Sequence, residues 1–277
     1  MIIAQISDTH LTLDTPDADQ RRRDFALTIA DLNALDPRPD VIVHTGDVAH
    51  NGRKDEYSEA AAILGKARAP IYLLAGNRDG RANLHAAFAA DGYLRSSDFL
   101  DYAIDDYPVR LIALDTLGPG NRGDFCAERT RRLTDLIEGN TRKPIAVFTH
   151  HPPFEVLVGP DRLHFETAEA LWRLRGALQQ SGRVVGIFSG HVHRAAEGYV
   201  GNIPASVVQC IATTLRKGDY PPPMKRRAVY HIHRFDPAWG FSTETRIVAA
   251  AALPQPVLEA PVVLARSSRT ATGTQQY

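Results

Sequence analysis

Residues 2–10 read IIAQISDTH, an apolar run that ends at a serine and is followed by an aspartate and a histidine. The same arrangement recurs four times, because the apolar runs Val41–Val43, Ile71–Leu74, Ile145–Phe148 and Val184–Phe188 precede HTGD, AGNRD, THHPP and SGHVH. Short runs rich in β-branched residues predict buried strands. The chain therefore places a cluster of polar, ligand-type side chains at the end of each of these predicted strands.

Amphipathic stretches separate the strands. Apolar residues at helical spacing predict helices over the ranges Arg23–Leu35, Asp55–Leu64, Glu128–Ile137 and Thr167–Gln179, and Val109–Leu114 predicts one further strand. Alternation of strands and helices indicates a layered α/β architecture around a largely parallel or mixed sheet. Ligands gather at the carboxyl ends of strands in such sheets, so the five polar loops are expected to converge on one site.

The converging loops supply oxygen and imidazole ligands without any thiolate. The candidate ligands are Asp8, His10, Asp47, Asn77, His150, His191 and His193. This mixture of carboxylate, amide and imidazole suits divalent manganese, iron, cobalt or zinc. Seven ligands are too many for one tetrahedral ion and suit two ions that share a carboxylate. Two such ions, about 3.5–4 Å apart, clamp a phosphoryl group in known two-metal sites.

The ordered motifs D-x-H, G-D, G-N-x-D, H and G-H-x-H, read here between Asp8 and His193, resemble those of calcineurin-like metallophosphoesterases. The resemblance runs from residue 1 to about residue 214. THHPP and LDTLGPGNRG further resemble the class III branch, which contains cyclic-nucleotide and glycerophosphodiester phosphodiesterases. The resemblance implies a four-layer α/β/β/α sandwich with a C-terminal hairpin extension. It also implies hydrolysis of a small phosphodiester by a metal-bridging hydroxide.

The resemblance also implies a division of the ligands between two divalent ions (Mn, Fe, Zn or Co). One ion would be held by Asp8, His10, Asp47 and His193, and the other by Asp47, Asn77, His150 and His191, with Asp47 bridging. In the pair of consecutive histidines the first is the expected ligand, and the second, His151, is a candidate for contact with the substrate.

Arg78 departs from the family pattern, which has histidine at this position of the motif GNRD. A guanidinium cannot donate a proton as a general acid, but it can clamp phosphate oxygens. Three hypotheses follow: His50 or His85 supplies the proton, only substrates with good leaving groups react fast, or Arg78 binds a second negative charge and favours monoesters. We expect a clamp with reduced acid catalysis. Asp79 is expected either to cap the following helix or to orient Arg78.

Other polar residues have less specific interpretations. His44 is expected to be a hydrogen-bonded core residue, and His164 lies in a loop that forms either a lid over the site or a solvated connection. The run 21–23, three arginines, is expected to be solvated. His231 and His233 alternate along one predicted strand, share its face and are expected to have structural roles.

Composition limits the functional classes. Of 277 residues, 44% are hydrophobic and 23% charged, which predicts a folded chain with a sizeable core. Thirty-two basic residues balance 32 acidic ones, which argues against a nucleic-acid-binding protein. Two cysteines cannot form a disulfide framework. The absence of a signal-like or membrane-spanning run predicts a cytoplasmic protein without membrane association.

The expected organisation is a catalytic domain over residues 1–248 and a tail over 249–277. Val229–Phe235 and Phe241–Val248 predict a hairpin that ends the domain, with a possible homodimer through this arm. Besides a small-phosphodiester hydrolase, two alternatives remain. One is a phosphomonoesterase in which Arg78 clamps a dianionic phosphate, and the other is a non-catalytic interaction scaffold.

Overall fold

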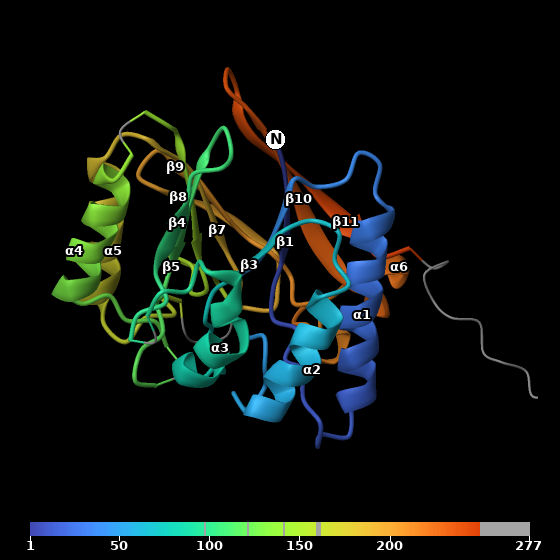
Figure 1. Ribbon diagram of the computed structural model, residues 1–277. Coiled ribbons are helices and arrows are strands. Elements are labelled where there is room, and N and C mark those ends of the chain that lie inside the picture. Colours follow the sequence, from blue (N-terminus) through green and yellow to red (C-terminus); the bar gives the residue numbers. More distant parts are fainter. Residues whose placement is uncertain (97, 121, 141, 159–161, 250–277) are drawn as a thin grey trace, which may run out of the picture.

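Two sheets stacked face to face form the centre of the protein in a computed structural model that describes residues 1–96, 98–120, 122–140, 142–158 and 162–249 (Figure 1). The first sheet has the strand order β11 (Gly240–Ile247), β10 (Val229–Asp236), β1 (Ile2–Ile6), β2 (Val41–His44), β3 (Ile71–Leu73). The second has the order β4 (Tyr102–Ile104), β5 (Arg110–Leu114), β6 (Ile145–Thr149), β7 (Val184–Ser189), β9 (Ile203–Val207), β8 (Ala196–Val200).

Helices cover the two outer faces of the stacked sheets (Figure 1). The longer helices are α1 (Ala18–Ala34), α2 (Lys54–Leu64), α3 (Arg81–Phe88), α4 (Ala127–Glu138) and α5 (Ala168–Gln180). Helices α1 and α2 lie outside the first sheet, α3 packs beside α2, and α4 and α5 lie outside the second sheet. The short elements are η1 (Ala89–Asp91), η2 (Thr213–Leu215) and α6 (Pro222–Lys225). The expected four-layer α/β/β/α sandwich is confirmed.

The central strands are buried on both faces, which explains their continuous apolar sequence. In β5, Leu111 and Ala113 pack into the core between the sheets, whereas Ile112 and Leu114 pack into the core under α4 and α5. Burying one such aliphatic side chain contributes about 1.5–3 kcal/mol. Because each face of a middle strand meets a different apolar layer, no polar alternation is possible there.

The structure differs from the sequence expectations at the start of α1. The helix begins at Ala18 rather than Arg23, and the expectation of a solvated arginine run is wrong for Arg21, which is 5% exposed. Its Nε donates to Asp17 Oδ2 over 2.9 Å and its Nη1 to the carbonyl of His10 over 3.3 Å. A buried guanidinium is tolerated because a carboxylate and a carbonyl satisfy it. Strands β4, β8 and β9 and helix α3 were not expected.

The C-terminal hairpin is part of the first sheet. Strand β10 pairs antiparallel with β1, with Ile2 opposite Arg234, and β11 forms the edge. The turn of the hairpin therefore lies at the amino end of β1, opposite the polar loops (Figure 1). The tail expected over 249–277 falls, from residue 250 on, outside the described residues.

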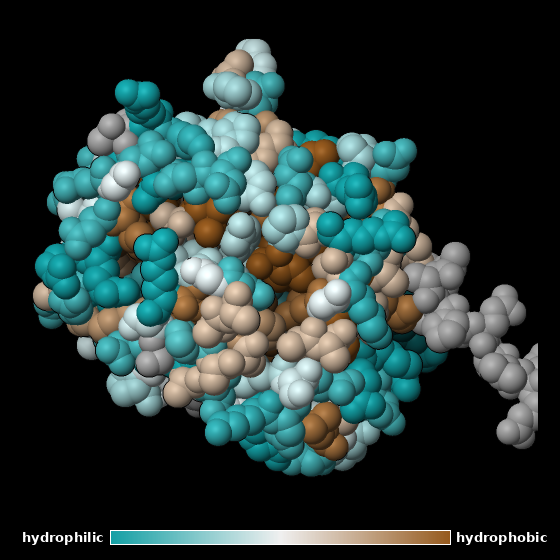
Figure 2. All heavy atoms as spheres, viewed as in Figure 1, coloured by the Kyte–Doolittle hydropathy of each residue, from teal (hydrophilic) through white to brown (hydrophobic). Residues whose placement is uncertain are grey.

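The outer surface is mainly hydrophilic on the face that Figure 2 shows, and hydrophobic residues reach it chiefly in the hollow along its middle. Among the described residues, no helix combines the length and apolar character needed to cross a membrane.

The hairpin histidines lie on one strand face, as expected. His233 is fully buried and bridges the sheet, with Nε2 donating to Gln5 Oε1 over 3.0 Å and Nδ1 lying 2.8 Å from Thr243 Oγ1. Gln5 in turn donates to the carbonyl of Ser189 in the second sheet over 3.0 Å. His231 is 5% exposed, and neither of its ring nitrogens has a hydrogen-bond partner among the described residues. Burial lowers the pKa of His231 from 6.5 to about 4.

Replacing His231 with leucine is expected to relieve an acid-dependent loss of stability. The unfolded chain binds a proton at this histidine below about pH 6.5, whereas the folded chain binds it only near pH 4, so stability falls as the pH is lowered between these values. The free-energy advantage of His231→Leu over wild type should grow by up to about 3 kcal/mol across this window.

Urea unfolding of both proteins from pH 8 to pH 4 measures this difference. His85→Leu, at a half-buried helix position, controls for removal of any histidine. A difference between His231→Leu and wild type that does not change with pH would contradict the prediction.

Candidate metal centre

Four predicted ligands from three loops form one tight group. Asp8 and His10 follow β1, Asp47 follows β2, and His193 follows β7; one ligand atom from each lies within 4.8 Å of all the others. His193 Nε2 is 3.3 Å from Asp8 Oδ1, and His10 Nε2 is 3.3 Å from Asp47 Oδ2. All four residues are buried or nearly so. The loops thus present two carboxylates and two imidazoles to one point.

The remaining predicted ligands form a second group beside the first. Asn77 Oδ1 lies 3.0 Å from His150 Nε2 and 2.8 Å from His191 Nδ1. Asp47 Oδ1 is 3.6 Å from His150 Nε2, so its two oxygens face the two groups. His151 also lies within 4.8 Å of His150 and His191 through ligand atoms. The structure thus brings all seven predicted ligands together, with Asp47 between the two groups.

The backbone of this region is held in a conformation that L-residues rarely adopt. Six non-glycine residues among those described have positive φ, and five are predicted ligands: Asp8 (54°), His10 (43°), Asp47 (54°), His191 (74°) and His193 (58°). Each such residue costs about 1–3 kcal/mol and persists only where the surroundings impose it. Backbone hydrogen bonds between the loops do so, including Asp8 N to Gly46 O and His10 N to Asp47 O, both 2.9 Å. Such concentrated strain is typical of functional sites.

Two glycines allow the loops to approach closely. A Cβ at Gly46, whose φ is 94°, would lie 2.7 Å from both Gly76 N and His150 Nδ1. A Cβ at Gly76 would lie 2.3 Å from the nitrogen of Asp47. The glycines of the G-D and G-N motifs are therefore required by contact between the loops after β2 and β3, and one of them also by its φ.

Carbonyl groups fix the imidazole orientation. The Nδ1 of His193 donates to Leu215 O over 3.0 Å, and the Nδ1 of His150 donates to Thr45 O over 2.8 Å. Because a carbonyl only accepts, the proton is on Nδ1, and each Nε2 lone pair points into the site.

The contacts of these ligand atoms show whether metal ions fit the site. His193 Nε2 lies 2.9 Å from His10 Nε2, and the fully buried Asp8 Oδ1 has no hydrogen-bond donor among the described residues. A cation between such closely spaced nitrogen and oxygen atoms would stabilise them. The nitrogen and oxygen donors suit the divalent ions named above. The residues present therefore fit a centre of divalent metal ions.

The electrostatics of the groups point the same way. Burial, followed by the charges of Asp8 and Asp79, raises the pKa of Asp47 well above its usual value. Burial and the neighbouring histidine His193 lower the pKa of His10 well below its usual value. Burial alone would lower the pKa of His193, but the adjacent carboxylate of Asp8, 3.3 Å away, raises it overall. Burial would also raise the pKa of Asp8, but the neighbouring histidines outweigh it and lower that pKa, so Asp47 is the carboxylate whose charge the protein does not balance and a bound cation would.

Asp79 has a structural role that differs from both expectations. It neither caps α3, whose N-cap is Gly80 without a side-chain bond, nor pairs with Arg78 among the contacts of the described residues. Instead its carboxylate accepts hydrogen bonds from Val48 N (3.1 Å), Ala49 N (3.0 Å), Tyr57 Oη (2.8 Å) and Gly76 N (2.9 Å). Asp79 therefore ties the loop after β2 to the loop after β3.

Arg78 lies at the exposed rim of the site. Its main-chain nitrogen donates to Asp47 Oδ1 over 2.7 Å, and among the described residues its guanidinium forms no ion pair. Of the two candidate proton donors, half-buried His50 is near the centre, with Nδ1 3.4 Å from His10 Nδ1. His85, on α3, makes no hydrogen bond to a predicted ligand within the described part of the chain.

Further residues surround the second group. The ring centroid of His151 lies 4.5 Å from that of His191, and its Nδ1 is 2.9 Å from Thr116 Oγ1. His164, the sixth residue with positive φ, has its centroid 5.2 Å from that of His191. Sequence reasoning missed Thr116, although its position just after a strand was a usable signal. It also missed Leu215, whose role lies in its carbonyl.

The fold and the two ligand groups define a metal-dependent phosphoester hydrolase. The calcineurin-like phosphoesterase family model matches residues 1–195, and the chain belongs to that family, whose members use a dinuclear divalent metal centre. Its resemblance to a solved dimetal phosphatase from Danio rerio extends over 90% of this chain and 99% of that one, with a TM-score of 0.63 and 15% identity.

Two curated relatives are named as phosphodiesterases. A probable glycerophosphodiester phosphodiesterase from Arcobacter nitrofigilis is 27% identical over 265 residues, covering 92% of this chain and 96% of that protein. A probable cyclic nucleotide phosphodiesterase from Rhodopseudomonas palustris is 28% identical over 198 residues, covering 68% and 69%.

Replacing Asp79 with asparagine is expected to loosen the loops that carry Asp47 and Asn77. Each carboxylate oxygen accepts two of the four hydrogen bonds, so the asparagine NH2 would face two of the donors, and stability should fall by about 1–3 kcal/mol. Thermal unfolding of metal-free protein measures the change. Asp106→Asn, at an exposed position, is the control. Equal stability of the two variants would show that the Asp79 contacts do not hold the loops.

Proposed function

We propose that the protein is a phosphodiesterase in which Asp8, His10, Asp47 and His193 hold one divalent ion, and Asp47, Asn77, His150 and His191 hold the other. The carrying observation is the position of Asp47, whose two carboxylate oxygens face the two ligand groups. When bound, the two ions supply Lewis-acid activation of the phosphoryl group and of the attacking water.

The chain's own residues orient the reactants. Asp79 and the glycines keep the loops in contact, so that the ligand atoms are in place before substrate binds. Arg78, exposed beside Asp47, is positioned to bind the non-bridging phosphate oxygens. His151, held by Thr116, lies on the side of the second group and contacts the substrate. These residues bind and hold the phosphodiester, whereas Arg78, which keeps its proton, cannot protonate a poor leaving group.

Small glycerophosphodiesters are the proposed substrates. The similarity to a probable glycerophosphodiester phosphodiesterase extends over almost the whole of both chains, whereas the similarity to a probable cyclic nucleotide phosphodiesterase covers about two thirds. A phosphodiester carries one negative charge, which a single guanidinium such as Arg78 can match. Cyclic nucleotides are the second candidate class.

Replacing the bridging carboxylate is expected to abolish the reaction. Asp47→Asn removes a charge that both ions share, so calorimetric titration with manganese should show weaker or missing binding at one site. Turnover of bis(p-nitrophenyl) phosphate should fall about 100-fold or more. Asp135→Asn, on the surface of α4, should retain both properties. Full activity of Asp47→Asn would refute the proposed bridging role.

Restoring the family's histidine tests the role of Arg78. Arg78→His is expected to raise turnover of glycerophosphocholine, which has a poor leaving group, more than turnover of bis(p-nitrophenyl) phosphate, because imidazolium can donate a proton. The ratio of the two kcat values measures this effect. Arg78→Gln has no charge with which to bind phosphate and no acidic proton to give to the leaving group, so it separates loss of substrate binding from gain of proton transfer. If Arg78→His left the ratio unchanged, another group would already supply the proton.

A further inference from the structure

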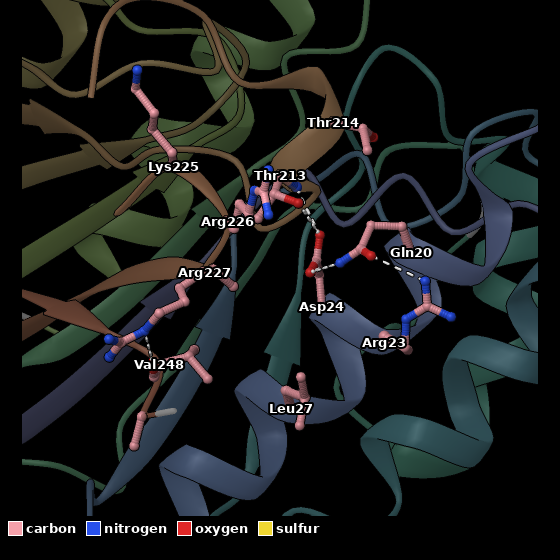
Figure 3. Close-up of a pocket in the computed structure, with 12 residues that line it drawn as sticks. Gln20, Arg23, Asp24, Leu27, Thr213, Thr214, Lys225, Arg226, Arg227 and Val248 are labelled. Carbon is pink, nitrogen blue, oxygen red and sulfur yellow. Dashed lines mark hydrogen bonds between the residues drawn. The ribbon is translucent and has the colours of Figure 1, made fainter. Parts of the chain in front are cut away.

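A separate cavity of about 580 Å3 lies beside the first turns of α1 (Figure 3). Its walls come from α1, η2, the segment from α6 to β10, and the end of β11. The lining residues are Gln20, Arg23, Asp24, Leu27, Thr213, Thr214, Lys225, Arg226, Arg227, Ala228, Val248 and Ala249. None of the seven proposed metal ligands is among them.

The cavity concentrates positive charge in a chain whose net charge is zero. Four cationic side chains line it against one carboxylate, Asp24. Arg23 Nη2 donates to Gln20 Oε1 over 3.0 Å, and Arg227 Nε donates to Val248 O over 2.6 Å (Figure 3). These acceptors are neutral, so they orient the guanidinium groups without cancelling their charge. A concave surface of one sign attracts ions of the other.

The single carboxylate does not neutralise these cations. Asp24 is 3% exposed, and its oxygens accept from Gln20 Nε2 (2.7 Å), Thr213 N (2.8 Å) and Thr213 Oγ1 (2.7 Å). Lys225 and Arg226 are exposed and form no ion pair within the described part of the chain. Two cations are therefore available to a ligand.

The same cavity offers apolar contacts. Leu27, Ala228 and Val248 form part of its wall. A site with an apolar wall and a few directed charges suits a ligand that has an apolar body and an acidic group. A bare inorganic anion would leave the apolar wall unused.

We propose that this cavity binds a small organic anion and that its occupancy changes the affinity of the metal centre. The connection is the segment from Thr213 to Arg216. Asp24 holds Thr213 through two hydrogen bonds, and two residues later the carbonyl of Leu215 accepts from Nδ1 of His193. Arg216 donates to Met224 O (2.6 Å) and Arg227 O (3.0 Å), joining this segment to the opposite wall. A ligand between the walls therefore bears on the carbonyl that orients a metal ligand.

The binding experiment uses 8-anilinonaphthalene-1-sulfonate, which has an aromatic body and a permanently charged sulfonate. Its fluorescence is titrated with full-length, manganese-loaded protein. Lys225→Ala combined with Arg226→Ala removes the two available cations. Neither side chain forms a hydrogen bond within the described part of the chain, so the change should weaken sulfonate binding about tenfold without disturbing the fold. Lys66→Ala with Arg68→Ala removes the same two residue types from an exposed loop outside the cavity and should leave binding unchanged.

Linkage to the metal centre is measured by calorimetric titration with manganese in the presence and absence of saturating sulfonate. At saturating sulfonate the manganese dissociation constant should change about fivefold or more in wild type and in Lys66→Ala/Arg68→Ala, whereas Lys225→Ala/Arg226→Ala should need about tenfold more sulfonate to reach half of that change. Absence of saturable binding, or equal weakening in both double variants, would overturn the site. Saturable binding without a change of manganese affinity would overturn its coupling to the metal centre.

Discussion

The negative charge of two carboxylates, Asp8 and Asp47, buried side by side after β1 and β2, is the constraint on which the rest of the site depends. Burial of an unpaired carboxylate is so costly that nearby groups must compensate for it. Of the nearby imidazoles, that of His150 has its proton on the far ring nitrogen and presents a lone pair to the site, and burial lowers its pKa, so it adds no positive charge. The protein therefore has a cation requirement built into its core, and metal binding and folding stability are coupled.

The loops place the metal ligands around the cation sites by adopting a strained and closely packed backbone. Asp8, Asp47 and His193 have positive φ, and Gly46 and Gly76 permit contact between adjacent loops that no larger residue allows. The two-sheet sandwich offsets this backbone strain, because its middle strands bury apolar side chains on both faces. The site is thus a strained assembly on a rigid base, which favours fixed ligand positions over adaptable ones.

Much of the fold could be predicted from the sequence because apolar runs and post-strand motifs are local signals. Short peripheral elements such as Ala196–Val200 could not, since their pairing depends on neighbours far away in the chain. The ligand types were readable from spacing, whereas the contacts that position them were not. Asp79 bonds to the loop after β2 as well as to its own loop, Leu215 acts through its carbonyl, and buried Arg21 resembles any surface arginine in sequence.

The pairing of β10 with β1 has a consequence for the order in which the protein forms. Ile2 lies opposite Arg234, so the strand that leads into Asp8 and His10 has one open edge until almost all of the described chain has been made. His191 and His193 also arrive late. During synthesis, the early loops therefore emerge with their carboxylates long before the later imidazoles can join them. Contacts between such distant segments slow folding, and an unpaired strand edge invites pairing with other chains. The nascent chain is thus exposed to aggregation for most of its synthesis, and assembly of the metal centre is a late event.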